Sequence, residues 1–410
     1  MATVKAFAYT SRDAGGKLVK GKVDAPTEAA VVSRLRTMGL SPVSIEESTV
    51  GSGLSRELTL PGIGQKPVGL KDLAIMSRQM ATMIAAGLSL LKTLMILSEQ
   101  TANKKLAGLL GEIRTDIESG SSLSDSLQKH PLDFPRLMIQ LVRAGEAGGF
   151  LDGALESIAT SFEADVKLRS TIKSALTYPV VVLCIAVLAV IGMLIFIVPV
   201  FQGMFDSLGG ELPIPTQILV VASQNMIWFI PVLVVAIIAF AIWWRGNKHR
   251  DAVRKVVDPI KLKFPVFGSL FQKVAIARFT RNFSAMIGAG VPILQSLSIV
   301  GETSGNWVIE QSIKNVQESV RTGNSISGPL ALEPVFPPMV VQMMAVGEDS
   351  GSMETMLSKI ADFYDEEVQT TADALTSLIE PLMIVVVGGL IGGIIISLYM
   401  PIFAVFQQIS

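Results

Sequence analysis

Three long apolar runs without a charged residue dominate the pattern of the chain. They cover residues 179–201, 218–244 and 381–406. A helix rises about 1.5 Å per residue, so each run is long enough to cross a hydrocarbon core of roughly 30 Å. Core helices of a soluble protein are the alternative, but they are seldom this long and this uniformly apolar. The pattern predicts three transmembrane helices, which place the two chain ends on opposite sides of a membrane.

Charges between the runs predict the orientation. The connector between the first two runs carries Asp206 and Glu211 but no lysine or arginine. The stretch after the second run is basic, with Arg245, Lys248, Arg250, Arg254, Lys255, Lys261 and Lys263. Basic loops stay in the cytoplasm. We therefore expect a cytoplasmic N-terminus and an extracytoplasmic C-terminus, and the first residues contain no apolar core of signal-peptide length.

Shorter periods divide the remaining sequence. Strand-like alternation at FAYTS and KLVKGKV, a helical TEAAVVSRLRTMG and a final PVSIEE predict a small ββαβ module, followed by a Gly-, Ser- and Pro-rich linker. From Leu70 apolar residues recur at helical spacing. The predicted order is module 1–48, linker 49–69, cytoplasmic helical bundle 70–178, span 179–201, extracytoplasmic loop 202–217, span 218–244, basic cytoplasmic connector 245–272, second cytoplasmic bundle 273–380, span 381–406 and extracytoplasmic tail 407–410.

An internal repeat joins each predicted bundle to a span. The stretch AGEAGGFLDGALESIATSF at 144–162 aligns with VGEDSGSMETMLSKIADFY at 346–364, and SRQMATMIAAGLSLL aligns with TRNFSAMIGAGVPIL. The same alignment continues into the membrane and pairs Pro179 with Pro381. A repeat of this size is a duplicated domain. The fold class is thus mainly α: an integral membrane protein with two duplicated cytoplasmic bundles, three transmembrane helices and a small N-terminal ββαβ module.

The repeated glycine and carboxylate motif could carry chemistry or structure. Its glycines are Gly145, Gly149, Gly347 and Gly351, and its carboxylates are Glu146, Asp152, Glu348 and Glu354. A catalytic acid and base need different environments, which two nearly identical copies do not suggest. We interpret the glycines as helix ends that allow a tight turn and the carboxylates as caps of the following helix. Binding of a divalent cation by the carboxylates is the weaker hypothesis.

Prolines and glycines suggest how the spans begin and pack. Pro179 and Pro381 are expected at the first position of their spans, where a missing N–H costs nothing, and Glu380 is expected to cap the third span, with proton or ion handling as its alternative. The third span contains two overlapping GxxxG spacings, formed by Gly388, Gly389, Gly392 and Gly393. We expect this face to pack against another span, within the chain or across a dimer.

Composition excludes several classes of function. A net charge of −1 offers no field for nucleic acid. The single cysteine, Cys184, and two distant histidines, His130 and His249, do not form a metal-binding motif, and no Walker loop is present. The apolar runs contain no charged residue, which argues against an ion-coupled transporter. The sequence predicts no cofactor and no metal.

These motifs resemble those of the platform-protein family of type IV pili, to which the type II secretion F protein also belongs. The resemblance covers nearly the whole chain and rests on the paired FPRLMIQLVRAGEAGGFL and FPPMVVQMMAVGEDSGSM and on the span starts TYP and EPLMIVVVGG. It implies a non-enzymatic inner-membrane platform. The implied partners are a cytoplasmic hexameric assembly ATPase, a retraction ATPase, pilin subunits and other inner-membrane assembly proteins.

Alternatives to this function are a secretion platform acting on pseudopilins and a transporter or scaffold unrelated to filaments. A transporter would need a polar site within the membrane, and the runs contain no charge that would form one.

Overall fold

The computed structural model describes residues 5–12, 18–25, 27–37, 41–47, 66–208, 213–248, 250–265 and 267–409. Most of the predicted linker, together with Glu211 and His249, lies outside these residues. The chain divides into two compact units, 1–64 and 65–410. Each unit is described by itself.

The first unit contains three strands and one helix, β1 (Lys5–Arg12), β2 (Leu18–Ala25), α1 (Glu28–Thr37) and β3 (Ser41–Glu47). The strands form one antiparallel sheet in the order β2-β1-β3. Val31 and Leu35 of α1 are buried. Their spacing of four residues places both on one helix face, where they form the apolar side of the unit.

The second unit begins with a helical bundle that ends in one long helix. Its members are α2 (Leu70–Ala85), α3 (Leu90–Gln100), α4 (Lys104–Glu118), α5 (Leu123–Gln128), α6 (Arg136–Gly148) and α7 (Leu151–Gly192). We call α2 to α6 with the first part of α7 the first bundle. Asn103 caps α4 by accepting hydrogen bonds from the N–H groups of Lys105 and Leu106.

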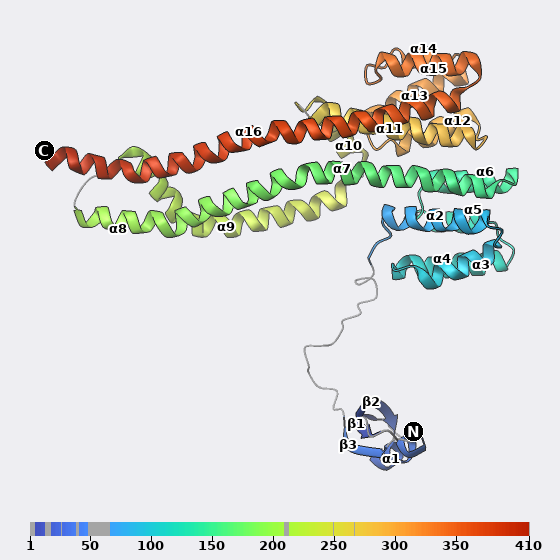
Figure 1. Cartoon of the computed structure of the whole chain (residues 1–410), viewed down its shortest axis with the longest axis horizontal. Helices are drawn as coiled ribbons and strands as arrows, with labels where there is room; N and C mark the ends of the chain where they lie inside the picture. The colour runs from blue at the N-terminus through green and yellow to red at the C-terminus, as the bar shows by residue number, and fades with distance from the viewer. Residues whose placement is uncertain are drawn as a thin grey trace. The chain divides into compact units, whose positions relative to one another are not determined.

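The second bundle repeats this order. Its members are α11 (Phe267–Gly288), α12 (Ile293–Thr303), α13 (Trp307–Arg321), α14 (Ser327–Leu330), α15 (Pro338–Ser350) and the first part of α16 (Met353–Ile409). Asn306 caps α13 as Asn103 caps α4. In each copy the long helix packs against the first helix, α7 against α2 and α16 against α11, and α7 and α16 also pack against each other (Figure 1). Both bundles share one continuous core of buried apolar residues.

Three helices in the described part of the chain are long and apolar enough to cross a membrane. The first continues from α7 through a π-helical segment, η1 (Met193–Ile197), into α8 (Val198–Leu208). The second is α9 (Ile214–Asn247), which leads to α10 (Asp251–Lys263), and the third is the C-terminal part of α16. A small apolar cluster joins them, consisting of Leu194, Val198, Val220, Ile394 and Leu398.

We predicted that Pro179 and Pro381 begin their helices, and this prediction was wrong. Both prolines lie inside helices, in α7 and α16. Glu380 likewise lies within α16 and caps no helix start. An interior proline leaves the carbonyl of residue i−4 without its helical donor. For Pro179 this carbonyl belongs to Ala175, and it lies 3.5 Å from the Thr376 hydroxyl of α16, which also contacts its own Ala372 carbonyl at 3.0 Å. Each bundle helix therefore continues without a break into its span.

Candidate functional site

The carboxylate of Glu146 fastens the end of α6 to the start of α5. Its Oε1 accepts a hydrogen bond from the N–H of Leu123 at 2.6 Å, and its Oε2 accepts one from Ser124 at 3.1 Å. The first N–H groups of a helix have no partner within the helix, so a carboxylate there satisfies them and interacts favourably with the helix dipole.

Glu348 makes the same contact in the second copy. Its carboxylate accepts hydrogen bonds from the N–H groups of Ile326 at 2.8 Å and Ser327 at 3.1 Å, and from the Ser327 hydroxyl at 3.0 Å. Our expectation that these glutamates cap the following helix was wrong. They cap the short helix that precedes their own, because the chain reverses between the two.

The four glycines of the motif divide into two roles. Gly149 and Gly351 end α6 and α15 in the left-handed conformation, with φ of 74° and 67°, which glycine adopts without a steric penalty. Gly145 and Gly347 are buried in the helices themselves. A Cβ on Gly145 would lie 2.6 Å from the Cβ of Ala154, so the missing side chain lets the next helix approach closely. No feature of the sequence alone indicated this second role.

Asp152 and Glu354 lie in the first turns of α7 and α16. Acidic residues there interact favourably with the positive end of the helix dipole. Among the described residues, no group of three His, Cys, Asp or Glu side chains is placed to hold a metal ion. The structure thus assigns Glu146 and Glu348 to backbone contacts and does not gather the four predicted carboxylates into one centre.

A duplicated ion pair binds each long helix to the first helix of its bundle. Arg78 of α2 donates to both carboxylate oxygens of Glu163 on α7, at 2.8 and 2.7 Å, and also pairs with Glu156. At the matching positions of the second copy, Arg281 pairs with Asp365. The hydrogen bond from Arg78 lowers the pKa of Glu163, and the bonds to Glu163 and Glu156 raise the pKa of Arg78. Both arginines therefore tie a bundle to its membrane helix.

A separate set of polar contacts joins the two copies. Arg278 of α11 pairs with Asp165 of α7, and burial lowers the pKa of this arginine. Arg136 at the start of α6 donates to Glu302 of α12 at 2.7 Å. The two arginines have no basic counterpart in the other copy, because Ile75 and Pro338 stand at the matching positions.

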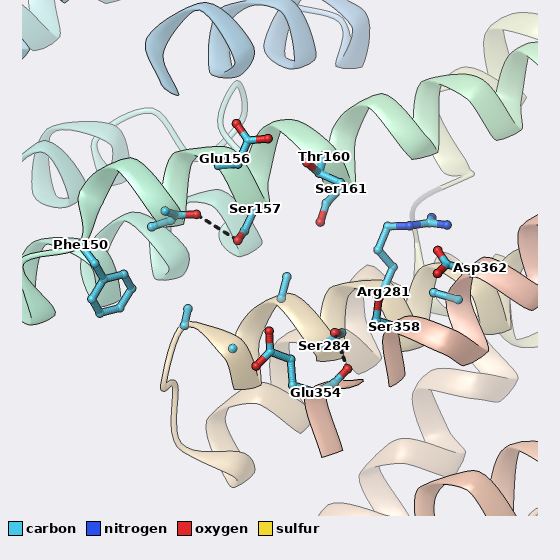
Figure 2. A pocket seen from close by; sticks show the side chains of 16 residues that line it. Phe150, Glu156, Ser157, Thr160, Ser161, Arg281, Ser284, Glu354, Ser358 and Asp362 are labelled. Carbon is cyan, nitrogen blue, oxygen red and sulfur yellow. Dashed lines mark hydrogen bonds between the residues drawn. The ribbon is translucent and has the colours of Figure 1, made fainter. Parts of the chain in front are cut away.

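A cleft of about 410 Å³ lies between α7 of the first copy and α11 and α16 of the second. Figure 2 shows Ser157 and Ser161 on one wall and Ser284 and Ser358 on the other. The lining is mostly small, with Gly153, Ala154, Ala285, Gly288, Ala289 and Ala361. Small side chains interlock little across such a gap. The copies therefore meet beside this cleft and are separated within it.

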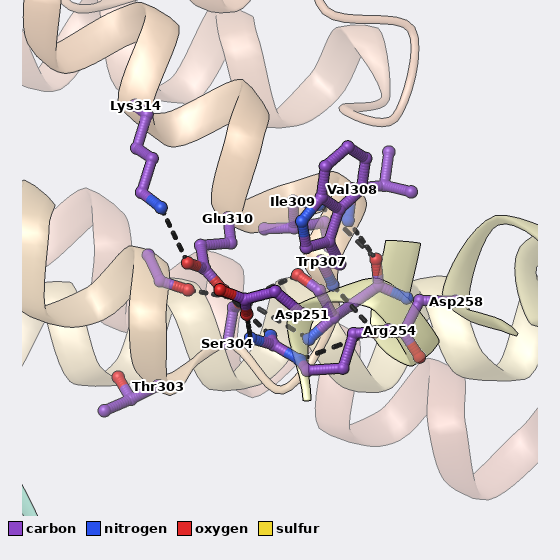
Figure 3. A network of polar contacts seen from close by, with 12 residues as sticks. Asp251, Arg254, Asp258, Thr303, Ser304, Trp307, Val308, Ile309, Glu310 and Lys314 are labelled. Carbon is purple, nitrogen blue, oxygen red and sulfur yellow. Dashed lines mark hydrogen bonds and ion pairs between the residues drawn. The ribbon is translucent and has the colours of Figure 1, made fainter. Parts of the chain in front are cut away.

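A polar network fixes α10 to α13 (Figure 3). Glu310 accepts hydrogen bonds from Arg254 and Lys314, both at 2.8 Å. Burial raises the pKa of Glu310, but these two bonds outweigh it and hold the pKa below its usual value. Asp258 is also buried and accepts the N–H of Trp307 at 2.9 Å, which caps α13. The predicted connector thus includes a docked helix, a role that its basic composition alone did not reveal.

The GxxxG glycines of α16 have no close neighbour in the described part of the chain. A Cβ on Gly388, Gly389, Gly392 or Gly393 would meet no heavy atom within 4 Å. Packing of this face within the chain is therefore not what the structure shows, and packing against a second copy stays a prediction.

Two hydroxyl groups of α9 fasten the spans together. Ser223 donates to the carbonyl of Leu194 in η1, and Thr216 donates to the carbonyl of Ser397 in α16, both at 2.5 Å. A π segment leaves carbonyls poorly matched to their helical donors, so an outside hydroxyl is a natural partner. In the sequence, Ser223 lies in an apolar run and Thr216 in the predicted extracytoplasmic loop 202–217, and neither position indicates its contact.

Known protein families match the two copies and the N-terminal module separately. The family described as type II secretion system (T2SS), protein F, matches residues 76–199 and again 279–401, and its N-terminal domain matches residues 1–46. The two matches agree with the internal repeat.

Similar proteins extend over nearly the whole chain. A type IV pilus assembly protein PilC of Myxococcus xanthus is 41% identical over 98% of this chain and 96% of its own length. The PilC of Thermus thermophilus is also 41% identical, over 98% and 99%. A type II secretion system protein F of Vibrio cholerae is 32% identical over 97% of each chain.

Proposed function

This chain belongs to the type II secretion system protein F family, and we infer that within the family it is a type IV pilus assembly platform. The inference rests on full-length similarity, which is higher to the relatives named for pilus assembly than to the secretion protein. Its three apolar helices are consistent with a protein of the inner membrane. A secretion platform acting on pseudopilins is the second candidate, because secretion relatives also match along almost the whole chain.

In the orientation that we propose, both bundles face the cytoplasm. Arg245, Lys248 and Arg250 follow the end of α9 and are exposed, and basic residues at the end of a span favour the cytoplasmic side. The C-terminus of α16 then lies outside. In this orientation the bundles meet a hexameric assembly ATPase, and a retraction ATPase when the filament shortens, while the spans meet pilin subunits and other assembly proteins.

The observation that carries the mechanism is the continuity of α7 and α16 from bundle to membrane. Arg78 and Arg281 tie each long helix to the first helix of its bundle. A displacement imposed on a bundle by the ATPase therefore reaches the span as a movement of one rigid helix. ATP is hydrolysed in the partner, and this chain transmits the movement.

The cleft gives the two copies room to move relative to each other. Its walls carry small side chains, whereas the copies are tied beyond it, where Arg278 meets Asp165 and Thr171 donates to Gln369 at 3.1 Å. Opening and closing of the cleft about these ties, with the exposed Arg136–Glu302 pair breaking and re-forming, would tilt α7 against α16. This is a hinge motion of packed helices.

Deletion and complementation test the platform role. A strain that lacks the chain should lose surface pili and recover them with the wild-type gene, and the tagged protein should copurify with the assembly ATPase. Unchanged piliation in the deletion strain, with loss of a secreted enzyme instead, would favour the secretion candidate.

A helix-softening variant tests the transmission. Ser377 and Glu380 are exposed on α16 between bundle and span, and each glycine weakens a helix by about 1 kcal/mol relative to alanine. Ser377→Gly with Glu380→Gly should reduce piliation at unchanged protein level, whereas the matched double alanine variant should not. Equal piliation in both variants would contradict transmission through α16 while leaving the platform role intact.

A further inference from the structure

The face of α10 that points away from the second bundle forms an apolar ridge. Val256, Ile260 and Phe264 recur every four residues and are 60%, 58% and 54% exposed. Residues at this spacing lie on one side of a helix. Side chains of this size are usually covered, so the ridge is a surface that the described part of the chain leaves without a partner.

An apolar groove runs beside this ridge. Val257, Ile260 and Phe264 of α10 line it together with Phe267 and Phe271 of α11, and its volume is about 360 Å³. The rings of Phe264 and Phe267 are 6.0 Å apart. The surface is therefore a ridge with an adjoining hollow, both hydrocarbon in character.

Positive charge surrounds the ridge. Lys263 of α10 is exposed on one side of the ridge and Lys261 lines the adjoining groove, and Arg245, Lys248 and Arg250 are exposed immediately before the helix. The acidic residues of the helix lie elsewhere, since Asp258 faces α13 and Asp251 lies near Arg254. A helix with an apolar face bordered by lysines has the pattern of a helix that lies in a membrane interface.

The position of α10 in the chain indicates what covers the ridge. The helix begins at Asp251, directly after α9 ends at Asn247, and α9 ends with Trp243, Trp244 and Arg245. Aromatic residues followed by basic ones mark the level of the lipid headgroups. The ridge is thus held within a few residues of the bilayer surface, where anionic headgroups complement its charge.

We propose that the ridge of Val256, Ile260 and Phe264 inserts into the cytoplasmic leaflet, with Lys263 and the basic residues before α10 on anionic lipid headgroups. The opposite face of α10 is fixed to the second bundle through Arg254, Asp258 and Glu310. This helix would then hold the second bundle at a set height above the membrane. The proposal rests on α9 being a span and does not depend on the pilus role.

Depth-dependent fluorescence quenching on the full chain tests the proposal. Replacing the single cysteine, Cys184→Ala, allows one reporter cysteine to be placed and labelled with an environment-sensitive dye. Ile260→Cys is the test position and Val256→Cys is a second one in case a single label disturbs folding. Lys255→Cys is the matched control, because five residues at roughly 100° each place it about 140° away from Ile260 on the same helix.

The labelled proteins are compared in lipid nanodiscs that contain anionic lipid. At Ile260 and Val256 we expect blue-shifted emission, quenching by lipid with a shallow acyl-chain spin label and protection from aqueous iodide. At Lys255 we expect the reverse. Replacement of the anionic lipid by a zwitterionic one should reduce the lipid quenching at the two ridge positions.

Two results would overturn the proposal. Iodide quenching at Ile260 and Val256 equal to that at Lys255 would show that the ridge faces water. Protection from iodide without quenching by the spin-labelled lipid would assign the ridge to a protein contact.

Discussion

Glu348→Gln is the sharpest test of the cap that Glu348 forms at the start of α14. The carboxylate accepts three hydrogen bonds, from the N–H groups of Ile326 and Ser327 and from the Ser327 hydroxyl. A hydrogen bond to a charged group contributes about 1.5–3 kcal/mol. Glutamine keeps one acceptor but turns an NH₂ group toward the remaining donors. We therefore expect a loss of about 2–3 kcal/mol in the free energy that keeps the start of α14 closed, allowing for partial compensation.

Hydrogen exchange measures this local free energy directly. Because α14 is short, its amides exchange through a local opening. A change of 1.4 kcal/mol is tenfold in an equilibrium constant, so the amides of Ile326 and Ser327 should exchange roughly 30- to 140-fold faster in the variant. Mass spectrometry of a peptide covering this stretch, from protein kept in nanodiscs, gives the rates.

A neighbouring substitution and the first copy serve as controls. Asp349→Asn removes an exposed carboxylate next to Glu348 and should leave these amides unchanged. Glu146→Gln should show a smaller effect on Leu123 and Ser124, because no hydroxyl bond to that carboxylate is lost. If Glu348→Gln leaves exchange at Ile326 and Ser327 equal to that of Asp349→Asn, the capping argument fails.

Three further outcomes follow from the packing, the spans and the ion network. Gly145→Ala places a Cβ 2.6 Å from Ala154 and should cost about 1–3 kcal/mol, seen as a lower Tm, whereas Gly153→Ala meets no atom within 4 Å and should leave Tm equal or higher. Ser223→Ala removes the donor to the π segment and should lower the free energy of unfolding in detergent by about 0.6 kcal/mol. A loss of several kcal/mol would contradict this estimate of the contribution of the hydrogen bond. The pKa of Glu310 is below its ordinary value because hydrogen bonds from Arg254 and Lys314 outweigh the effect of burial. The contribution of Glu310 to the stability of the α10 contact is therefore complete above the unfolded pKa of about 4.3 and is lost as pH falls through the lower folded pKa. Pepsin cleavage within α10 should rise over that window in the wild type, while Glu310→Gln should be cleaved readily throughout; identical pH profiles would contradict the role of this carboxylate.

The charges of this protein illustrate what composition can and cannot indicate. The run of basic residues after the second span predicted an orientation, but by charge alone every basic residue had the same role. In the structure Arg254 is bonded to Glu310 and serves the attachment of α10, whereas Lys255 and Lys263 are exposed. The difference arises from the helix face on which each residue lies and from what packs against that face.

The sequence by itself determined the repeat, the three apolar helices and the glycine ends of α6 and α15. These features depend on local properties, namely the length of an apolar run, a period of 3.6 residues and the tolerance of glycine for positive φ. Gly149 and Gly351 could be recognised for this reason without knowledge of any distant residue.

Only the tertiary structure decided what the motif residues contact. Glu146 reaches Leu123, and Thr216 of α9 donates to the carbonyl of Ser397 in α16. Such pairings bring together groups that are far apart in sequence, so they depend on where the chain reverses and which helices pack. Proline alone predicted a helix start, but α7 and α16 continue through Pro179 and Pro381. That continuity is the physical basis of the transmission from the bundles to the spans that we propose.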